Sequence, residues 1–370
     1  MCNYRNYEEA EVSFSAGINL VYGKNAQGKT NLLESIYLLC LGRSFRVSKN
    51  DELIKEEASH FTISGSFILD SKLQKKVVVH CTRNGKKEIS VDGKRLQRHS
   101  KLFGSFPIVV MSPDDYRISE GGPAERRKFV DILLSQVSVS YLTNLQEYHR
   151  ILRQRNKLLQ DFREGTQHDH GVLEPWSAAL IEYGCQIMRQ RFAFLREFRD
   201  VLRRIYAEYT QSNDELGIQW DASVSSTDAE SELEDGFKRR LNQLRAAELA
   251  TGRTLVGPHR DDLVLYVNGK PLRRFGSRGE HKSALISLKI AEYHFLKDKV
   301  QETPVVLLDD YYSELDDERE AKVFKSLTGL GQVFVTTPKA EIFEVRKSDV
   351  GERSSTRRFY VQNGRLEQQA

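Results

Sequence analysis

The chain has 370 residues, which is long enough for two domains and a sizeable core. Its 56 Lys and Arg residues nearly balance 52 Asp and Glu residues, so the net charge of +4 excludes a grossly basic tail and leaves nucleic-acid binding to local patches. The cysteines form no Cys-x-x-Cys pair, no apolar run approaches a membrane span, and residues 1–14 lack an apolar signal core. We therefore expect a cytoplasmic protein, with no membrane association, disulfide or zinc site.

Residues 1 to about 112 have the pattern of a strand-rich segment. Ile18–Tyr22 predicts a short buried strand, and Phe61–Leu69 and Lys76–Cys81 alternate or carry β-branched runs. The sequences Asn84-Gly85 and Asp92-Gly93 are hairpin turn signals. Phe106–Met111 predicts one more buried strand before the character of the chain changes at Ser112-Pro113-Asp114-Asp115.

A phosphate-binding loop follows the first buried strand. The sequence GKNAQGKT fits G-x-x-x-x-G-K-[ST], and Asn31–Cys40 after it predicts a helix with one apolar face. The N–H groups of such a loop surround phosphate oxygens, its Lys reaches the β- and γ-phosphates, and the helix dipole favours the anion. The alternative is a glycine turn before an ordinary helix. The predicted ATP-binding residues are Gly23, Lys24, Asn25, Ala26, Gln27, Gly28, Lys29 and Thr30.

From about Pro123 to Thr251 the apolar residues recur at helical spacing, with breaks near Gly165–Gly171 and Ser212–Ser226. Helices of this length suit a compact lobe or a short arm, and are far too short for a long coiled-coil rod.

Residues from about 254 onward return to alternating strands and helices. The run Pro304–Leu308 predicts a buried parallel strand that ends in Asp309 and Asp310, and the carboxyl ends of such strands bind ligands. We expect Thr30 and Asp309 to hold Mg²⁺, and Asp310 to act as the catalytic residue that orients or deprotonates the attacking water. The alternative is a strand that ends in an ordinary turn.

The phosphate loop and the Asp-Asp strand must share one site, although about 280 residues separate them. The simplest solution is an α/β head assembled from both chain ends, with a mainly α-helical lobe inserted between them. The predicted domains are an N-terminal head part at 1–112, a helical lobe at 113–251 and a C-terminal head part at 252–370.

Further elements look like those of an ABC-type P-loop ATPase. Ser277 and Gly279 form a Ser-x-Gly signature at a helix start upstream of the Asp-Asp strand. Ser313 and Asp316 look like a D-loop, and Thr337 occupies the switch position at the end of the next strand. In such ATPases the signature meets the γ-phosphate bound by a second subunit, so two ATP molecules lie within a head-to-head dimer.

Four longer phrases resemble the RecF family of bacterial recombination-repair ATPases, which are related to SMC proteins. The resemblance covers nearly the whole chain and implies a slow, DNA-stimulated ATPase that binds duplex, gapped or junction DNA without sequence preference. It also implies an ATP-dependent homodimer that acts with RecR-like and RecA-like proteins in replication, recombination and the damage (SOS) response. The phrases are TNLLESIYLLCLGRSFR (30–46), SPDD…GGPAERRKFVD (112–131), TLVGPHRDDL (254–263) and LLDDYYSELD (307–316).

The sequence departs from the family pattern at three places. Ala26 replaces the usual Gly of the phosphate loop, and Glu280-His281-Lys282 replaces the usual Gln-Gln-Arg of the signature helix. The family also carries a strand before the Tyr4–Tyr7 segment, so we expect either a start placed too late or a missing head strand. Ala26 and the altered signature keep open a non-hydrolysing, nucleotide-dependent DNA clamp. An ABC-type energy-coupling ATPase is the other alternative, against which the large helical insertion and the GPHRDDL phrase argue.

Basic residues on the predicted helices and loops are candidates for DNA phosphate contacts, although such residues are usually solvated and paired with nearby Glu. The candidates are Arg43, Arg46, Lys49, Arg126, Arg127, Lys128, Arg150, Arg153, Arg155, Lys157, Lys238, Arg239 and Arg240.

Overall fold

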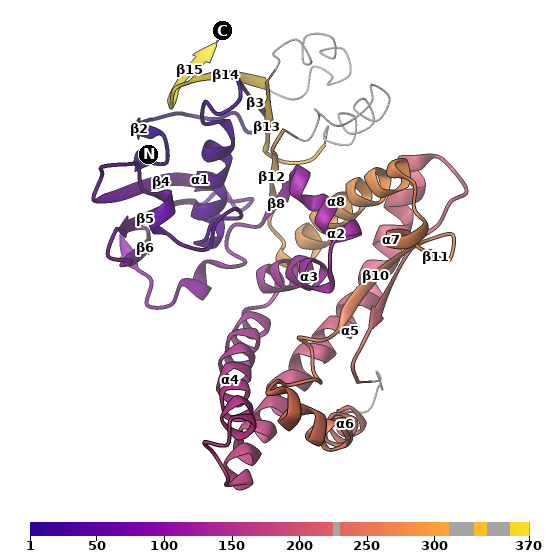
Figure 1. Ribbon diagram of the computed structural model, residues 1–370. Coiled ribbons are helices and arrows are strands. Elements are labelled where there is room, and N and C mark those ends of the chain that lie inside the picture. The colour runs from indigo at the N-terminus through magenta and orange to yellow at the C-terminus, as the bar shows by residue number, and fades with distance from the viewer. Residues whose placement is uncertain (225–229, 311–328, 339–355, 370) are drawn as a thin grey trace. The chain divides into compact units, whose positions relative to one another are not determined.

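The computed structural model describes residues 1–224, 230–310, 329–338 and 356–369. The chain forms two compact units (Figure 1). The head unit comprises Met1–Asp115 and Leu288–Ala370, and the lobe unit comprises Tyr116–Ser287. The lobe unit thus ends later than the predicted lobe of 113–251. The reason is that residues 262–267, which follow the long helices, pair with residues 216–221, which lie between two of these helices.

The main sheet of the head unit is built from both ends of the chain, as expected. Its inner strands pair in parallel, and the last strand of the chain is antiparallel to its neighbour. Over the described residues the strand order is β15 (Arg365–Gln369), β14 (Thr356–Gln362), β3 (Ile18–Tyr22), β13 (Val333–Thr337), β12 (Val305–Leu308) and β8 (Ile108–Met111).

A second, antiparallel sheet of the head unit comes from the first hundred residues. The predicted turns are confirmed, because Gly85 and Gly93 have φ values of 82° and 76° at hairpin turns. The Tyr4–Tyr7 segment is the turn between the short strands β1 and β2. The order is β2 (Tyr7–Glu9), β1 (Cys2–Tyr4), β4 (His60–Ile68), β5 (Gln74–Thr82), β6 (Lys87–Val91) and β7 (Lys94–Arg95).

Helix α1 (Lys29–Leu41) packs against β13 of the main sheet and against β4 and β5 of the second sheet (Figure 1). The predicted apolar face is buried, with Leu32, Leu33 and Leu39 all at most 6% exposed. Because both sheets cover it, the start of this helix is held at the edge where the main-sheet strands end.

The lobe unit is mainly helical. Helices α4 and α5 pack along each other, and α6 packs on both (Figure 1). The helices are α2 (Tyr116–Glu120), α3 (Pro123–Val137), α4 (Val139–Arg163), α5 (Glu174–Thr210), α6 (Glu230–Thr251) and α7 (Leu272–Phe275), and α8 (Arg278–Val300) begins in this unit and continues into the head unit.

The lobe unit also contains a small antiparallel sheet in the order β11 (Lys270–Pro271), β10 (Asp262–Val267) and β9 (Leu216–Asp221). Strand β9 lies where the sequence predicted only a helix break. Its buried Leu216, Ile218 and Trp220 alternate with more exposed residues, so a period-two signal was present. This pairing attaches residues 262–271 to the lobe unit.

Candidate nucleotide site

The phosphate-binding loop turns sharply between β3 and α1. Gly23 and Gly28 have φ values of 150° and 120°, and between them Lys24, Asn25 and Ala26 are exposed. Lys29 is 4% exposed, and its Nζ donates to the carbonyl oxygens of Gly23 at 2.9 Å and Lys24 at 3.2 Å. The cation therefore lies inside the curve of the loop, where phosphate oxygens bind in sites of this class.

Ala26 has a φ of 63°, in the left-handed region that glycine adopts at little cost. An Ala there costs on the order of 1 kcal/mol. Ala26 therefore keeps the left-handed turn that the family's glycine would form, but with local backbone strain.

The predicted metal residues meet at the edge of the sheet. Thr30 Oγ1 donates to Asp309 Oδ1 at 2.8 Å, and Thr336 Oγ1 donates to the same oxygen at 2.9 Å. Thr336 also accepts the Asp310 N–H at 2.8 Å. Thr336, which precedes the proposed switch residue Thr337 on β13, was not predicted, because nothing in the sequence tells which residue of a strand end turns toward its neighbour.

Burial raises the pKa of the Asp309 carboxyl, and the nearby Asp310 raises it further, whereas the hydrogen bonds from Thr30 and Thr336 lower it. A bound cation would favour the ionised form of this buried carboxylate. The carboxylate of Asp309 and the hydroxyl of Thr30 also supply the oxygen ligands that hard cations prefer. The residues present thus fit Mg²⁺.

Arg46, which the sequence suggested only as a DNA contact, acts electrostatically on this site. Its charge lowers the pKa of Asp309, and its Nη1 donates to Asn31 Oδ1 at 3.0 Å. Asn31 in turn donates to Asn6 Oδ1 at 2.8 Å. The exposed arginine is therefore fixed to α1 on the nucleotide side of the head unit.

Two hairpin turns from opposite ends of the chain hold the phosphate loop from outside. The Gln27 carbonyl accepts from Asn6 Nδ2 at 2.8 Å and from the Gly364 N–H at 3.0 Å. The Asn363 N–H donates to Gln27 Oε1 at 2.7 Å, and Tyr7 donates to the Gly28 carbonyl at 3.0 Å. Sequence reasoning missed these contacts, because a turn at residue 363 has no motif that points to residue 27.

The signature lies in the lobe unit, at the start of α8. The Glu280 N–H donates to Ser277 Oγ at 3.2 Å, and the Ser277 N–H donates to Glu280 Oε2 at 2.7 Å. This reciprocal pair is a capping box, and it gives Glu280, the departure from the family pattern, a local structural role. Gly279 is on the first turn of the same helix, whereas the proposed D-loop residues Ser313 and Asp316 lie outside the described residues.

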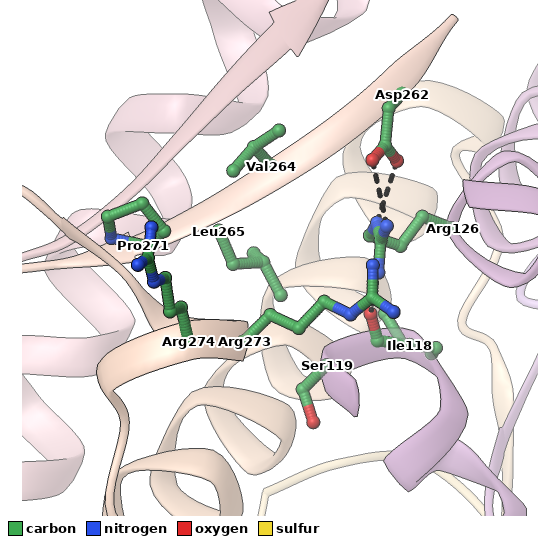
Figure 2. A pocket seen from close by; sticks show the side chains of 9 residues that line it. All are labelled: Ile118, Ser119, Arg126, Asp262, Val264, Leu265, Pro271, Arg273 and Arg274. Atoms are coloured by element: carbon green, nitrogen blue, oxygen red, sulfur yellow. Dashed lines mark hydrogen bonds and ion pairs between the residues drawn. The ribbon is translucent and has the colours of Figure 1, made fainter. Parts of the chain in front are cut away.

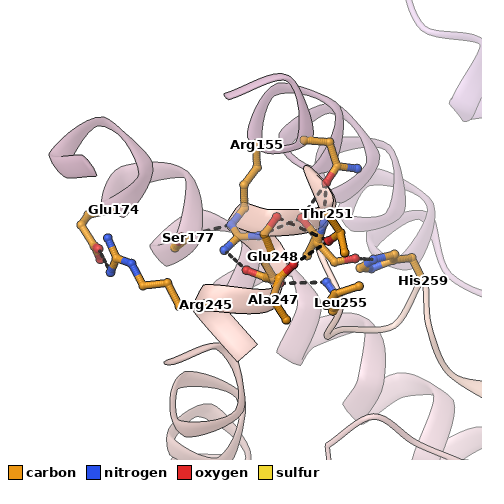
Figure 3. A network of polar contacts seen from close by, with 11 residues as sticks. Arg155, Glu174, Ser177, Arg245, Ala247, Glu248, Thr251, Leu255 and His259 are labelled. Carbon is orange, nitrogen blue, oxygen red and sulfur yellow. Dashed lines mark hydrogen bonds and ion pairs between the residues drawn. The ribbon is translucent and has the colours of Figure 1, made fainter. Parts of the chain in front are cut away.

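Two of the candidate DNA contacts are wrong. Arg126 is 4% exposed and binds both carboxylate oxygens of Asp262 at 2.7 and 2.8 Å. Arg155 is 2% exposed and donates to Glu248 at 2.7 Å (Figure 3). Buried arginines that are already paired cannot reach a DNA backbone, and their acids lie about a hundred residues or more away in the chain, beyond the reach of sequence patterns.

The GPHRDDL phrase has mainly structural roles. His259 Nδ1 lies 2.6 Å from the Tyr148 hydroxyl, and burial lowers the pKa of His259 to about 4. Asp261 is fully buried and accepts from Trp220 Nε1 at 3.2 Å and the Ser223 N–H at 2.8 Å. The phrase therefore joins β9, β10 and α4 rather than forming a separate catalytic site.

The phosphate loop lies between the parallel strand β3 and helix α1, and Thr30 joins it to Asp309 at the end of β12. This arrangement defines the chain as a P-loop ATPase head of the ABC and SMC class. The family described as "RecF/RecN/SMC N terminal domain" matches residues 1–358. The DNA replication and repair protein RecF of Chloroherpeton thalassium is 36% identical over 94% of this chain and 96% of its own length. That of Acetivibrio thermocellus is 36% identical over 93% of each. The chain therefore belongs to the RecF family.

Solved structures agree with this assignment. A structure described as the recombination mediator protein RecF-ATPrS in the RecFOR pathway has a TM-score of 0.91 and 34% identity, and the match covers 100% of this chain and 96% of the other. The Smc head domain from Pyrococcus furiosus has a TM-score of 0.54 at 15% identity, over 99% of this chain and 94% of the other, and so shares the fold alone. No helix in the described part of the chain is long and apolar enough to span a membrane.

Proposed function

We propose that this chain is an ATP-dependent DNA-binding protein of recombinational repair. The observation that carries the proposal is the hydrogen bond between Thr30 and Asp309, because it brings the phosphate loop and an acidic strand end together from opposite ends of the chain. Relatives solved as RecF-ATPrS and RecF-ATP support ATP as the nucleotide.

In this proposal the residues Gly23 to Thr30 bind the phosphates, and Lys29 moves from its loop carbonyls to phosphate oxygens. Thr30 and Asp309 would hold Mg²⁺, which would neutralise charge on the phosphates. Asp310 orients or deprotonates the attacking water. Because an Asp side chain is short and phosphoryl transfer depends on positioning, we expect slow turnover, and we expect DNA to stimulate it.

Ser277 and Gly279 would complete the site of a second copy, so ATP would stabilise a two-fold dimer. The capping box with Glu280 supports a preformed helix start whose N–H groups can face an anion. We further propose Ser313 and Asp316 as D-loop residues and Thr337 as the switch residue of this dimer.

Duplex, gapped or junction DNA would bind through phosphate contacts, since the remaining basic candidates offer no base-reading pattern. The pathway named for the solved relatives supports RecR-like and RecA-like partners, with the chain acting as a recombination mediator. Action on DNA in a bacterium implies the cytoplasm.

Mixing two inactive variants tests the proposal. Ser277→Arg should still bind ATP through its own loop but fail to dimerise or hydrolyse it, and Lys29→Ala should fail to bind ATP. Together they should recover one working composite site per heterodimer, seen as phosphate release in the mixture alone. The result that overturns the dimer model is loss of ATP binding by Ser277→Arg itself. If the unmodified protein binds ATP and DNA without phosphate release, it is a non-hydrolysing clamp.

A further inference from the structure

A cavity of about 450 Å³ opens in the lobe unit, and none of the residues assigned to the nucleotide lines it (Figure 2). It lies among α2, α3, α7 and the strands β10 and β11. The lining residues are Ile118, Ser119, Arg126, Asp262, Val264, Leu265, Pro271, Arg273 and Arg274.

The floor of this cavity is apolar. Ile118 and Leu265 are 6% and 4% exposed, and the partly buried Val264 and Pro271 extend the apolar surface outward. A cavity of this size that combines an apolar surface with convergent charged groups has the composition of a ligand-binding site. It can accept one or two apolar side chains of a partner.

The charge of the cavity is unbalanced. Asp262 is the single acid of the lining, and Arg126 takes both of its carboxylate oxygens and donates to the carbonyls of Ile118 and Gly121. Two further arginines, Arg273 and Arg274, stand at the cavity without an ion pair among the residues the structure describes.

Arg273 and Arg274 are both exposed. Their contacts are with a backbone carbonyl and an aromatic ring, and neither contact neutralises the positive charge. Arg273 Nε donates to the Glu120 carbonyl at 3.1 Å, and its side chain reaches across the cavity toward Arg126 (Figure 2). The Arg274 guanidinium lies 5.2 Å from the ring centroid of Phe275, which is 59% exposed. Guanidinium groups with free N–H donors bind carboxylates in two-pronged geometry.

We propose that this cavity is a docking site for an acidic peptide segment of a partner protein. An apolar side chain of the segment occupies the floor of Ile118, Val264 and Leu265, and flanking Asp or Glu residues bind Arg273 and Arg274. A nucleic acid fits less well, because the apolar surface of Ile118, Val264 and Leu265 offers no donor to a phosphate backbone, and no aromatic ring lines the cavity for a base to stack on.

Fluorescence polarisation with fluorescein-labelled nine-residue peptides tests the proposal. The set carries Asp and Glu around a central Leu, Phe or Trp, and the controls replace the central residue with Ser or the acids with Lys. We expect saturable binding of at least one apolar-centred acidic peptide to the full chain without ATP. The Ser-centred control should bind at least about tenfold more weakly.

Charge reversal gives the decisive comparison. The variant Arg273→Glu with Arg274→Glu should lose at least about tenfold in affinity and should gain binding of the lysine peptide. Arg199→Glu with Arg204→Glu, which makes the same change in net charge on exposed residues of α5, should bind as the unmodified chain does. The proposal is overturned if no peptide of the set binds, or if both double variants behave alike. Competition by single-stranded DNA at Arg273 and Arg274, without peptide binding, would make the cavity a nucleic-acid site instead.

Discussion

Thr30 Oγ1 donates to Asp309 Oδ1 at 2.8 Å across 279 residues of sequence. The contact arises because β3 and β12 lie on either side of β13 and all three run in the same direction. Their carboxyl ends therefore share one edge, where the loop after β3 and the aspartates after β12 meet. This single edge is the basis of the predictions for the nucleotide site.

Asp309→Asn should make the nucleotide-free protein more stable at neutral pH. Burial raises the folded-state pKa of Asp309 above its usual value of 3.8, so the folded chain holds this proton more tightly than the unfolded chain. Stability is therefore lost as pH rises from the unfolded pKa through the folded pKa. Asn carries no charge and still accepts from Thr30 and Thr336.

Urea unfolding from about pH 4 to pH 7 measures this effect, and we expect a gain on the order of 1 kcal/mol that widens as pH rises. Stabilisation by ATP with Mg²⁺ should be lost in the same variant. If the Asp309→Asn variant is less stable throughout, or keeps the full stabilisation by Mg²⁺ and ATP, the aspartate does not belong to the proposed metal site.

Asp310→Asn should bind ATP and hydrolyse it at least about a hundredfold more slowly, since the side chain loses its ability to deprotonate or orient water. Asp310 has a φ of 46°, which Asn tolerates better than other residues, so the backbone and its hydrogen bond to Thr336 should persist. Single-turnover phosphate release separates hydrolysis from binding. An unchanged rate would place the catalytic role on another acid.

The sequence predicted the loop, the helix and the two aspartates because each is a local pattern with a characteristic period or spacing. It could not predict which side chains complete the site. Thr336, Asn6 and the turn at Asn363 act through contacts set by strand order. Arg126 looked like a solvent-exposed helix residue, and only its pairing with the distant Asp262 buries it.

Strand β9 shows a different limit. Its alternating Leu216, Ile218 and Trp220 carried a strand signal, but the strand is short and lies between two long helices. A strand of six residues is stable only when another strand pairs with it. Its partner β10 begins at Asp262, so the small sheet depends on contacts that no local window contains.

Gly364→Ala should weaken the outer support of the phosphate loop. Gly364 has a φ of 70°, and a Cβ placed there would lie 2.1 Å from the Asn6 carbonyl oxygen. Gly85 is a matched control, because its φ is 82° and a Cβ there would meet nothing within 4 Å. Both substitutions incur about 1 kcal/mol for the left-handed backbone.

Gly364→Ala should cost more than Gly85→Ala and should also reduce ATP affinity, because displacement of Asn6 breaks its bond to Gln27. Urea unfolding and an ATP titration on both variants measure the two effects. Equal losses of stability, with ATP affinity unchanged in both, would mean that the turn does not support the loop.

Glu248→Ala should destabilise the lobe unit strongly. Glu248 accepts from Arg155 Nη2 at 2.7 Å and from the Leu255 N–H at 2.8 Å, and the side chains of Glu248 and Arg155 are 1% and 3% exposed (Figure 3). Removing the carboxylate leaves a buried guanidinium without its counter-charge, which costs about 3–5 kcal/mol.

The exposed pair Arg245–Glu174 in the same unit is the control, with side chains 39% and 61% exposed. Glu174→Ala should cost less than about 1 kcal/mol, because water screens this pair. A double replacement, Arg155→Met with Glu248→Leu, should recover much of the loss, since it removes both charges and leaves apolar side chains of similar size. Urea unfolding of the four proteins measures these differences. If Glu248→Ala is no more damaging than Glu174→Ala, the buried pair does not hold α4 and α6 together.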